Sequence, residues 1–119
     1  MSARVALIGS ASDNRSTTAA YLKSAGFDVH VYVELGVPTG FEGVVLLREG
    51  DGAAIAHQVR AWMKTARSLR VVVVTPKPFE LRDVAATFGE RIAVLAAPVF
   101  GWQVVDALRA PPAAGPRGA

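Results

Sequence analysis

Short apolar runs alternate along the chain with stretches that are apolar on one face only. The runs are rich in β-branched residues and too short for helices, so each predicts a β-strand. The predicted strands span residues 4–9, 28–33, 43–47, 70–75 and 91–97. The second of them alternates, with His30 and Tyr32 opposite three valines. This alternation is typical of an edge strand and gives His30 a structural explanation.

The stretches between the strands carry apolar residues three and four positions apart, which predicts amphipathic helices. The predicted helices span residues 15–25, 53–66, 79–88 and 101–110. No helix is expected in 34–42, because Gly36, Pro38 and Gly40 interrupt it. Strands that alternate with helices form a parallel sheet with right-handed crossovers. The predicted fold class is α/β, a doubly wound five-stranded parallel sheet of order 2-1-3-4-5, with the second helix reduced to a loop.

The length, charge and composition of the chain predict its domain organisation and exclude some kinds of partner. The chain of 119 residues predicts one domain, over residues 1–110, followed by a flexible tail or linker at 111–119. Such a linker indicates a module of a longer chain. The net charge of +3 is spread over single basic residues, so we expect no nucleic-acid binding. The chain has no cysteine and no apolar stretch near the ~20 residues of a membrane span. We expect a cytoplasmic protein that does not contact membranes.

The strand 43–47 ends abruptly in charges and glycines, which places Arg48 at the carboxyl end of a predicted central strand. Ligands of open α/β sheets bind at that end. A buried guanidinium without a partner is costly, so Arg48 is solvated, paired with a carboxylate such as Asp13, or holding an anion. In the last case Ser10, Ser12 and Thr75 would join it around a phosphate or small anion at the start of the first helix.

The order and spacing of elements over residues 4–110 resemble the receiver domains of two-component response regulators, the CheY-like family with a flavodoxin-like fold. Receivers of that family hold two acidic residues after the first strand and a phosphoaccepting aspartate after the third. They hold a threonine or serine after the fourth strand and a lysine followed by a cis proline after the fifth. These residues bind Mg²⁺, accept phosphate and signal its arrival.

Only two positions of this chain match that pattern, the hydroxyl and the proline. The corresponding residues are Gly9 and Ser10 for the acidic pair, Arg48 for the acceptor, Thr75, Ala97 for the lysine, and Pro98. Mg²⁺ requires carboxylates and aspartyl phosphate requires an aspartate. Glu49 and Asp51 are interpreted as loop and capping residues. The resemblance therefore implies a degenerate receiver, or pseudo-receiver, that is not an enzyme, takes no cofactor or metal and is not phosphorylated on aspartate.

Three further features bear on partners. Phe100 and Trp102 lie near the usual output surface of receivers, where they would anchor another protein, another domain of the same chain or a second copy; otherwise they belong to the core. The two prolines in 75–78 either lock a loop that moves in ordinary receivers or end one strand and begin one helix. The basic stripe is interpreted as a solvated helix face. It comprises Arg60, Lys64 and Arg67.

Two alternatives belong to other function classes. Residues 9–13 resemble the Gly-Ser-x-Ser-Asp loop of purine-biosynthetic carboxyaminoimidazole mutases, although the Ser-Ala-His-Arg stretch of that family is missing. The hydroxyl-rich segment 10–18 is also similar to a flavodoxin-like phosphate, nucleotide or flavin site. Its hydroxyls cap a helix without any ligand, however, which weakens the second alternative.

Overall fold

The computed structural model describes residues 3–9, 15–32, 40–47, 52–65, 68–97 and 99–109. The strands are β1 (Arg4–Ile8), β2 (Asp28–Tyr32), β3 (Gly43–Leu47), β4 (Arg70–Thr75) and β5 (Ile92–Ala96). The helices are α1 (Arg15–Ser24), α2 (Gly52–Thr65), α3 (Arg82–Phe88) and α4 (Gly101–Arg109). Two 3₁₀ turns, η1 (Pro78–Leu81) and η2 (Gly89–Arg91), flank α3. Every predicted strand and helix is present.

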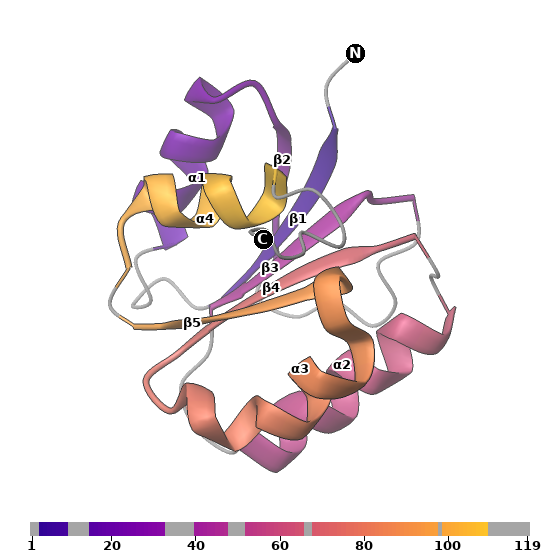
Figure 1. Ribbon diagram of the computed structural model, residues 1–119. Helices are drawn as coiled ribbons and strands as arrows, with labels where there is room; N and C mark the ends of the chain where they lie inside the picture. The colour runs from indigo at the N-terminus through magenta and orange to yellow at the C-terminus, as the bar shows by residue number, and fades with distance from the viewer. Residues whose placement is uncertain are drawn as a thin grey trace, which may run out of the picture.

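The strands form one parallel sheet in the order β2-β1-β3-β4-β5 (Figure 1). The predicted fold class and strand order are therefore confirmed, and β2 is an edge strand as its alternation indicated. The predicted loop that replaces a second helix lies largely in residues 33–39, outside the described part of the chain.

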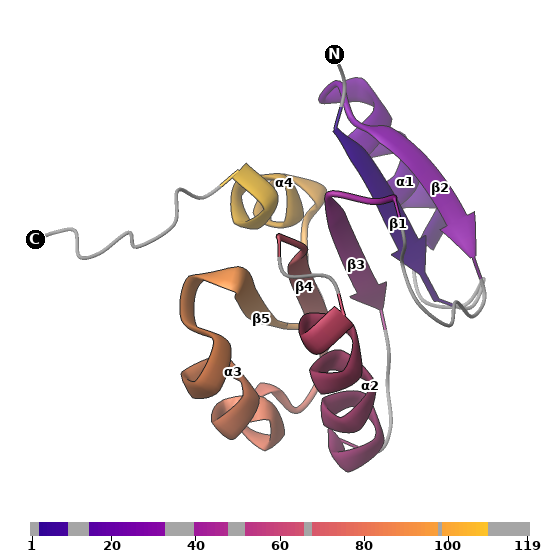
Figure 2. The same cartoon turned by 90° about the vertical axis from the view of Figure 1, so that its right-hand side faces the viewer.

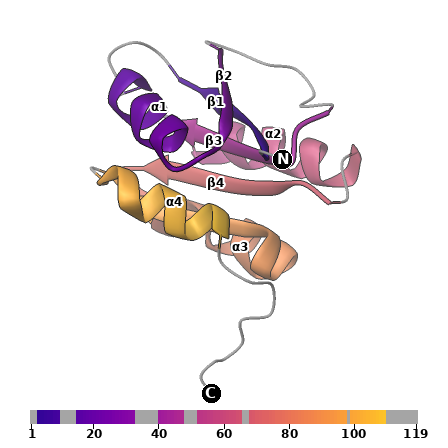
Figure 3. The ribbon, with the colours of Figure 1, turned by 90° about the horizontal axis from the view of Figure 1, so that it is seen from above.

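Helices cover both faces of the sheet. Figure 1 shows α1 and α4 on one face and α2 and α3 on the other, and Figure 3 shows α4 running alongside β4, which it contacts. Each face has its own core, because successive strand residues point to opposite sides. Buried Trp62 of α2 belongs to one core and buried Val104 of α4 to the other. Arg60 and Lys64 lie on the exposed side of α2, so the predicted solvated face is confirmed for these two; Arg67 is not described.

An aromatic side chain covers part of the sheet that α2 and α3 leave open. Figure 2 shows these helices gathered beside β3, β4 and β5, away from β2. There Phe41 makes edge contacts with His30 and Tyr32, at centroid distances of 5.6 and 6.0 Å. The guanidinium of Arg4 lies 4.8 Å from the Phe41 ring centroid. His30 also lies 3.2 Å from the Asp28 carboxylate, so its structural interpretation is confirmed.

The predicted and observed bounds differ most around α3. The predicted helix 79–88 is divided in the structure into a 3₁₀ turn, η1, which begins at Pro78, and the α-helix α3. The helix ends at Gly89, whose φ of +57° favours glycine. Residue 91 belongs to η2, so β5 starts one residue later than predicted. Within the described ranges, every helix is too short or too polar to cross a bilayer.

Candidate functional site

The predicted site lies where the parallel strands end. Ile8, Leu47 and Thr75 close β1, β3 and β4, and the strand order places β3 between the other two. Residue 48 therefore directly follows the middle strand of the three, as the sequence predicted. Several predicted site residues fall outside the described part of the chain. They are Ser10, Ser12, Asp13, Arg48, Glu49, Asp51 and Pro98.

Gly9 is the residue that the sequence resemblance matches to the first of the two acidic residues of receivers. Its N–H donates to the carbonyl of Tyr32 (3.0 Å), and its own carbonyl accepts from Nη1 of Arg15 (2.9 Å). Arg15 is half-buried at the start of α1, an end at which a helix disfavours cations. Its hydrogen bond to Gly9 offsets that cost. This guanidinium was not foreseen from the sequence, because the contact joins residues across a loop.

Thr75 and Ala97 lie together at the ends of β4 and β5. The N–H of Ala97 donates to the Thr75 carbonyl (2.9 Å). Thr75 is buried, and its Oγ1 accepts from the N–H of Lys77 (3.2 Å). The hydroxyl thus holds the turn that leads into Pro78. This geometry fits the strand-ending role of the two prolines, while a locked loop stays a prediction.

The described part of this edge does not suit a magnesium ion. Mg²⁺ requires oxygen ligands that include carboxylates. Gly9, Thr75 and Ala97 supply none, and Arg15 adds a positive charge that repels a metal. Across the described ranges there is also no group of three or more His, Asp or Glu side chains that could hold a metal ion.

A carboxylate that the sequence analysis did not single out lies at the start of α2. A Cβ added to Gly52 would be 2.5 Å from Oε1 and 2.7 Å from Cβ of Glu80, so the Glu80 side chain lies directly against Gly52. Free amides at a helix N-terminus favour a negative charge. Glu80 of η1 therefore complements α2 from a distant part of the chain.

The two aromatic residues proposed as partner anchors are on the surface. Phe100 is 70% exposed and Trp102 is 52% exposed, so their alternative assignment to the core is wrong. Tyr21 of α1, which is 44% exposed, packs over Gly101, the residue between them. We call Tyr21, Phe100 and Trp102 the aromatic patch. Tyr21 was missed because only the packing of α1 on α4 brings it there.

The chain resembles receiver domains among solved structures. No family model and no curated protein sequence matches it. A CheY-like receiver domain protein from Methanospirillum hungatei has a TM-score of 0.73 at 13% identity, over 92% of both chains. The HemR receiver domain from Leptospira biflexa, solved without phosphorylation, has a TM-score of 0.64 at 18% identity, over 89% of this chain and 90% of that one.

A third similar structure is the receiver domain of a sensor histidine kinase from Pseudomonas aeruginosa, which has magnesium in its active-site cleft. It has a TM-score of 0.61 at 15% identity, over 92% of this chain and 96% of that one. At these identities the likeness establishes the fold alone. This chain has the CheY-like receiver fold.

Proposed function

We propose that the chain is a receiver-like signalling module that binds another protein, or another domain of its own chain, without being phosphorylated on aspartate. The aromatic patch is the observation that carries this proposal. We also infer that the module is cytoplasmic and is not an enzyme. A surface that binds its partner without phosphorylation explains how a chain with the receiver fold could signal. The positions that match the acidic residues of receivers lack them in this sequence.

The aromatic patch has the composition of a binding surface. Large apolar side chains gathered on the outside of a protein lose favourable burial unless something covers them. Aromatic residues also dominate the energetically important positions of protein interfaces. Tyr21 belongs to α1 and Trp102 to the first turn of α4, and Phe100 directly precedes α4. Because α1 packs on α4 at Gly101, this surface is held in place before any partner binds.

Two features support independence from phosphorylation. The sequence has Arg48 at the acceptor position, and an arginine cannot form an aspartyl phosphate. The described edge of the sheet has the guanidinium of Arg15 on the Gly9 carbonyl, in the region where a receiver would gather carboxylates around magnesium. A positive charge at this edge favours anions over metal ions.

The experiment is affinity capture from the native host with three forms of the chain. We expect wild type to retain a specific protein and the double variant Phe100→Ser/Trp102→Ser to lose it. Phe79→Ser is the matched control, because Phe79 is an aromatic residue of η1 that is 63% exposed and outside the patch. The proposal fails if the double variant retains the same protein as wild type, or if Phe79→Ser loses it equally.

The positive charge at the carboxyl edge also favours the alternative in which this edge holds a phosphate or nucleotide. Arg15 is the described residue that supports it, beside the predicted contributions of Ser10, Arg48 and Thr75. Titration calorimetry with phosphate and with nucleotides decides the point. Heat of binding that disappears in Arg48→Gln supports the anion site, whereas no heat at millimolar ligand rejects it.

A further inference from the structure

The outer side of β2 carries backbone groups that pair with no other strand. Within the described ranges β2 is an edge strand that pairs with β1 alone. The N–H of Asp28 donates to the carbonyl of Ala3, which precedes β1 (2.9 Å). Backbone groups of successive strand residues point to opposite sides, so those of Val29 and Val31 point away from β1. These groups can accept one more strand.

A groove runs between this edge and α1, which packs on β2 (Figure 2). Its volume is about 340 Å³. It is lined by Val31 of β2 and by five residues of α1, namely Arg15, Ser16, Ala19, Ala20 and Lys23. At the helical repeat these five positions share one flank of α1, and Tyr21 lies on the opposite flank, against Gly101. The groove is therefore separate from the aromatic patch.

The middle of the groove is apolar and its two ends are cationic. Val31 is 41% exposed, and the small side chains of Ala19 and Ala20 leave room beside it. Arg15 begins α1 and Lys23 lies in its last turn, so the helical rise separates them by about 12 Å. Within the described ranges neither of these two cations has a carboxylate at ion-pair distance. The groove thus offers two positive charges on either side of an apolar centre.

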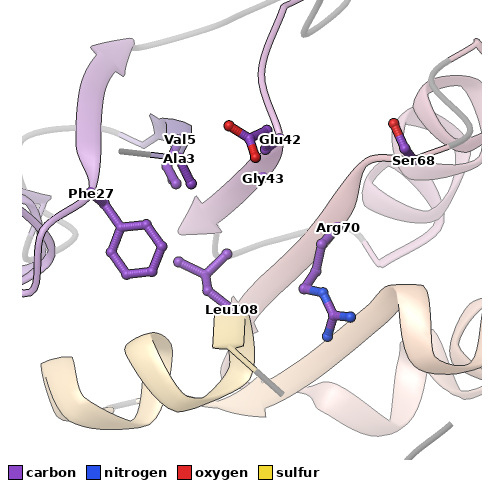
Figure 4. A pocket seen from close by; sticks show the side chains of 8 residues that line it. All are labelled: Ala3, Val5, Phe27, Glu42, Gly43, Ser68, Arg70 and Leu108. Carbon is purple, nitrogen blue, oxygen red and sulfur yellow. The ribbon is translucent and has the colours of Figure 1, made fainter. Parts of the chain in front are cut away.

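The charge of the groove selects the kind of partner. A cavity of about 320 Å³ at the amino edge of the sheet is bordered by Arg70 and Glu42, which carry opposite charges and point in different directions (Figure 4). That cavity gives no preference for one sign of charge. The charged residues that line the groove, Arg15 and Lys23, are both cationic, so the groove complements an acidic partner.

The same charges disfavour a second copy of this chain as the occupant. Two copies joined along β2 would place only apolar side chains beside Val31. Asp28 points to the other face of the sheet, where it pairs with His30 (3.2 Å). The cations of each copy would then find no carboxylate and would approach like charges. An acidic segment of another protein avoids this repulsion.

We propose that an extended acidic segment of a partner protein adds a strand to β2 in this groove. Alternate side chains of such a strand face α1, and residues four apart are separated by about 13 Å. A segment with acidic, apolar and acidic residues at positions i, i+2 and i+4 therefore matches the groove. Its carboxylates pair with Arg15 and Lys23, and its apolar side chain lies beside Val31. Backbone hydrogen bonds to β2 supply further affinity. The proposal does not depend on the function proposed above.

The test is an NMR titration of the ¹⁵N-labelled chain with the capped peptide Thr-Glu-Thr-Phe-Thr-Glu-Thr. One control peptide has lysine in place of both glutamates. The other, Thr-Thr-Glu-Phe-Glu-Thr-Thr, turns both glutamates to the opposite face of the strand from phenylalanine. We expect the first peptide to slow hydrogen exchange of the Val29 and Val31 amides. Each control should bind about tenfold more weakly or worse, because it loses both ion pairs at the ends of the groove.

Protein variants assign the binding to this groove. Lys23→Glu should bind the glutamate peptide about tenfold more weakly and should no longer prefer it to the lysine peptide. Lys64→Glu, on the exposed side of α2, is the matched control and should bind as wild type does. Phe100→Ser/Trp102→Ser should also bind the peptide as wild type does, which separates this groove from the aromatic patch.

Three results would overturn the proposal. The first is equal binding of the three peptides, and the second is unchanged exchange of the Val29 and Val31 amides at millimolar glutamate peptide. The third is slower exchange of these amides as the protein concentration rises without peptide, which would assign the edge to a second copy of the chain.

Discussion

Gly52 is the residue at which a single methyl group tests a long-range contact. Its three closest neighbours on the side of a missing Cβ are atoms of Glu80, at 2.5 to 3.2 Å. Alanine normally stabilises a helix relative to glycine by about 0.5–1 kcal/mol. Here the clash outweighs that gain, so we expect Gly52→Ala to lower the free energy of unfolding by about 1–2 kcal/mol. Urea unfolding measures it, and an increase in stability would show that Glu80 does not lie against α2.

The residues that the sequence analysis missed share one property. Arg15, Tyr21 and Glu80 each contact a residue outside their own helix or turn, and no local pattern distinguishes them from solvated residues. Phe100 and Trp102 could be singled out from their position near the end of β5, but their exposure could not. Burial of an aromatic side chain depends on which helices pack around it.

The contact between α1 and α4 can be tested at Gly101. A Cβ at this position would lie 2.5 to 2.8 Å from three atoms of Tyr21. We expect Gly101→Ala to push Tyr21 off α4 and to destabilise the fold by about 1–3 kcal/mol. Urea unfolding measures the loss of stability, and affinity capture measures the accompanying loss of the partner. If stability and partner binding were both unchanged, the packing of Tyr21 over Gly101 would be wrong.

The packing of α2 on the sheet can be tested with two substitutions on opposite sides of the helix. Trp62 is 1% exposed within the core, whereas Lys64 lies on the outer side. We expect Trp62→Ala to cost about 3–5 kcal/mol of stability. Lys64→Ala should stay within about 0.5 kcal/mol of wild type. Chemical unfolding of both variants gives the comparison, and similar losses would contradict the orientation of α2.

The elements were largely predictable because their signals are local. The runs 43–47 and 70–75 are apolar on both faces, which only a buried parallel strand explains, and their observed bounds are the same. Gly89 follows the last residue of α3 and Gly101 begins α4, as the sequence predicted. The division of the predicted helix 79–88 was missed, since the spacing of apolar residues does not distinguish a 3₁₀ turn from an α turn after Pro78.

The whole molecule has the receiver fold, and Arg15 brings a positive charge to the carboxyl edge of its sheet. The likeness to solved receivers over about nine tenths of the chain establishes the fold. The structure places Gly9, Thr75 and Ala97 at this edge, while Ser10, Arg48 and Pro98 lie outside the described ranges. The positions of Ser10, Arg48 and Pro98 at this edge stay predictions from the sequence. The absence of phosphorylation on aspartate is also a prediction.

An aspartate at position 48 should not by itself make the chain a substrate for phosphorylation. Arg48→Asp supplies a carboxylate at the acceptor position but leaves Gly9 and Ser10 unable to hold Mg²⁺, and Arg15 keeps its charge at this edge. We expect Arg48→Asp to remain unphosphorylated when incubated with acetyl phosphate and Mg²⁺, as judged by intact mass. Efficient labelling of Arg48→Asp would mean that another group in the pocket holds the metal.

The most direct test of the central claim is the same measurement on the unmodified chain. The purified protein is incubated with acetyl phosphate and Mg²⁺, beside a conventional receiver domain as positive control, and its intact mass is recorded before and after. We predict that the control gains a phosphoryl group and that this chain does not. A phosphoryl group on this chain that requires Mg²⁺ and is released by hydroxylamine, as an acyl phosphate would be, would contradict the account.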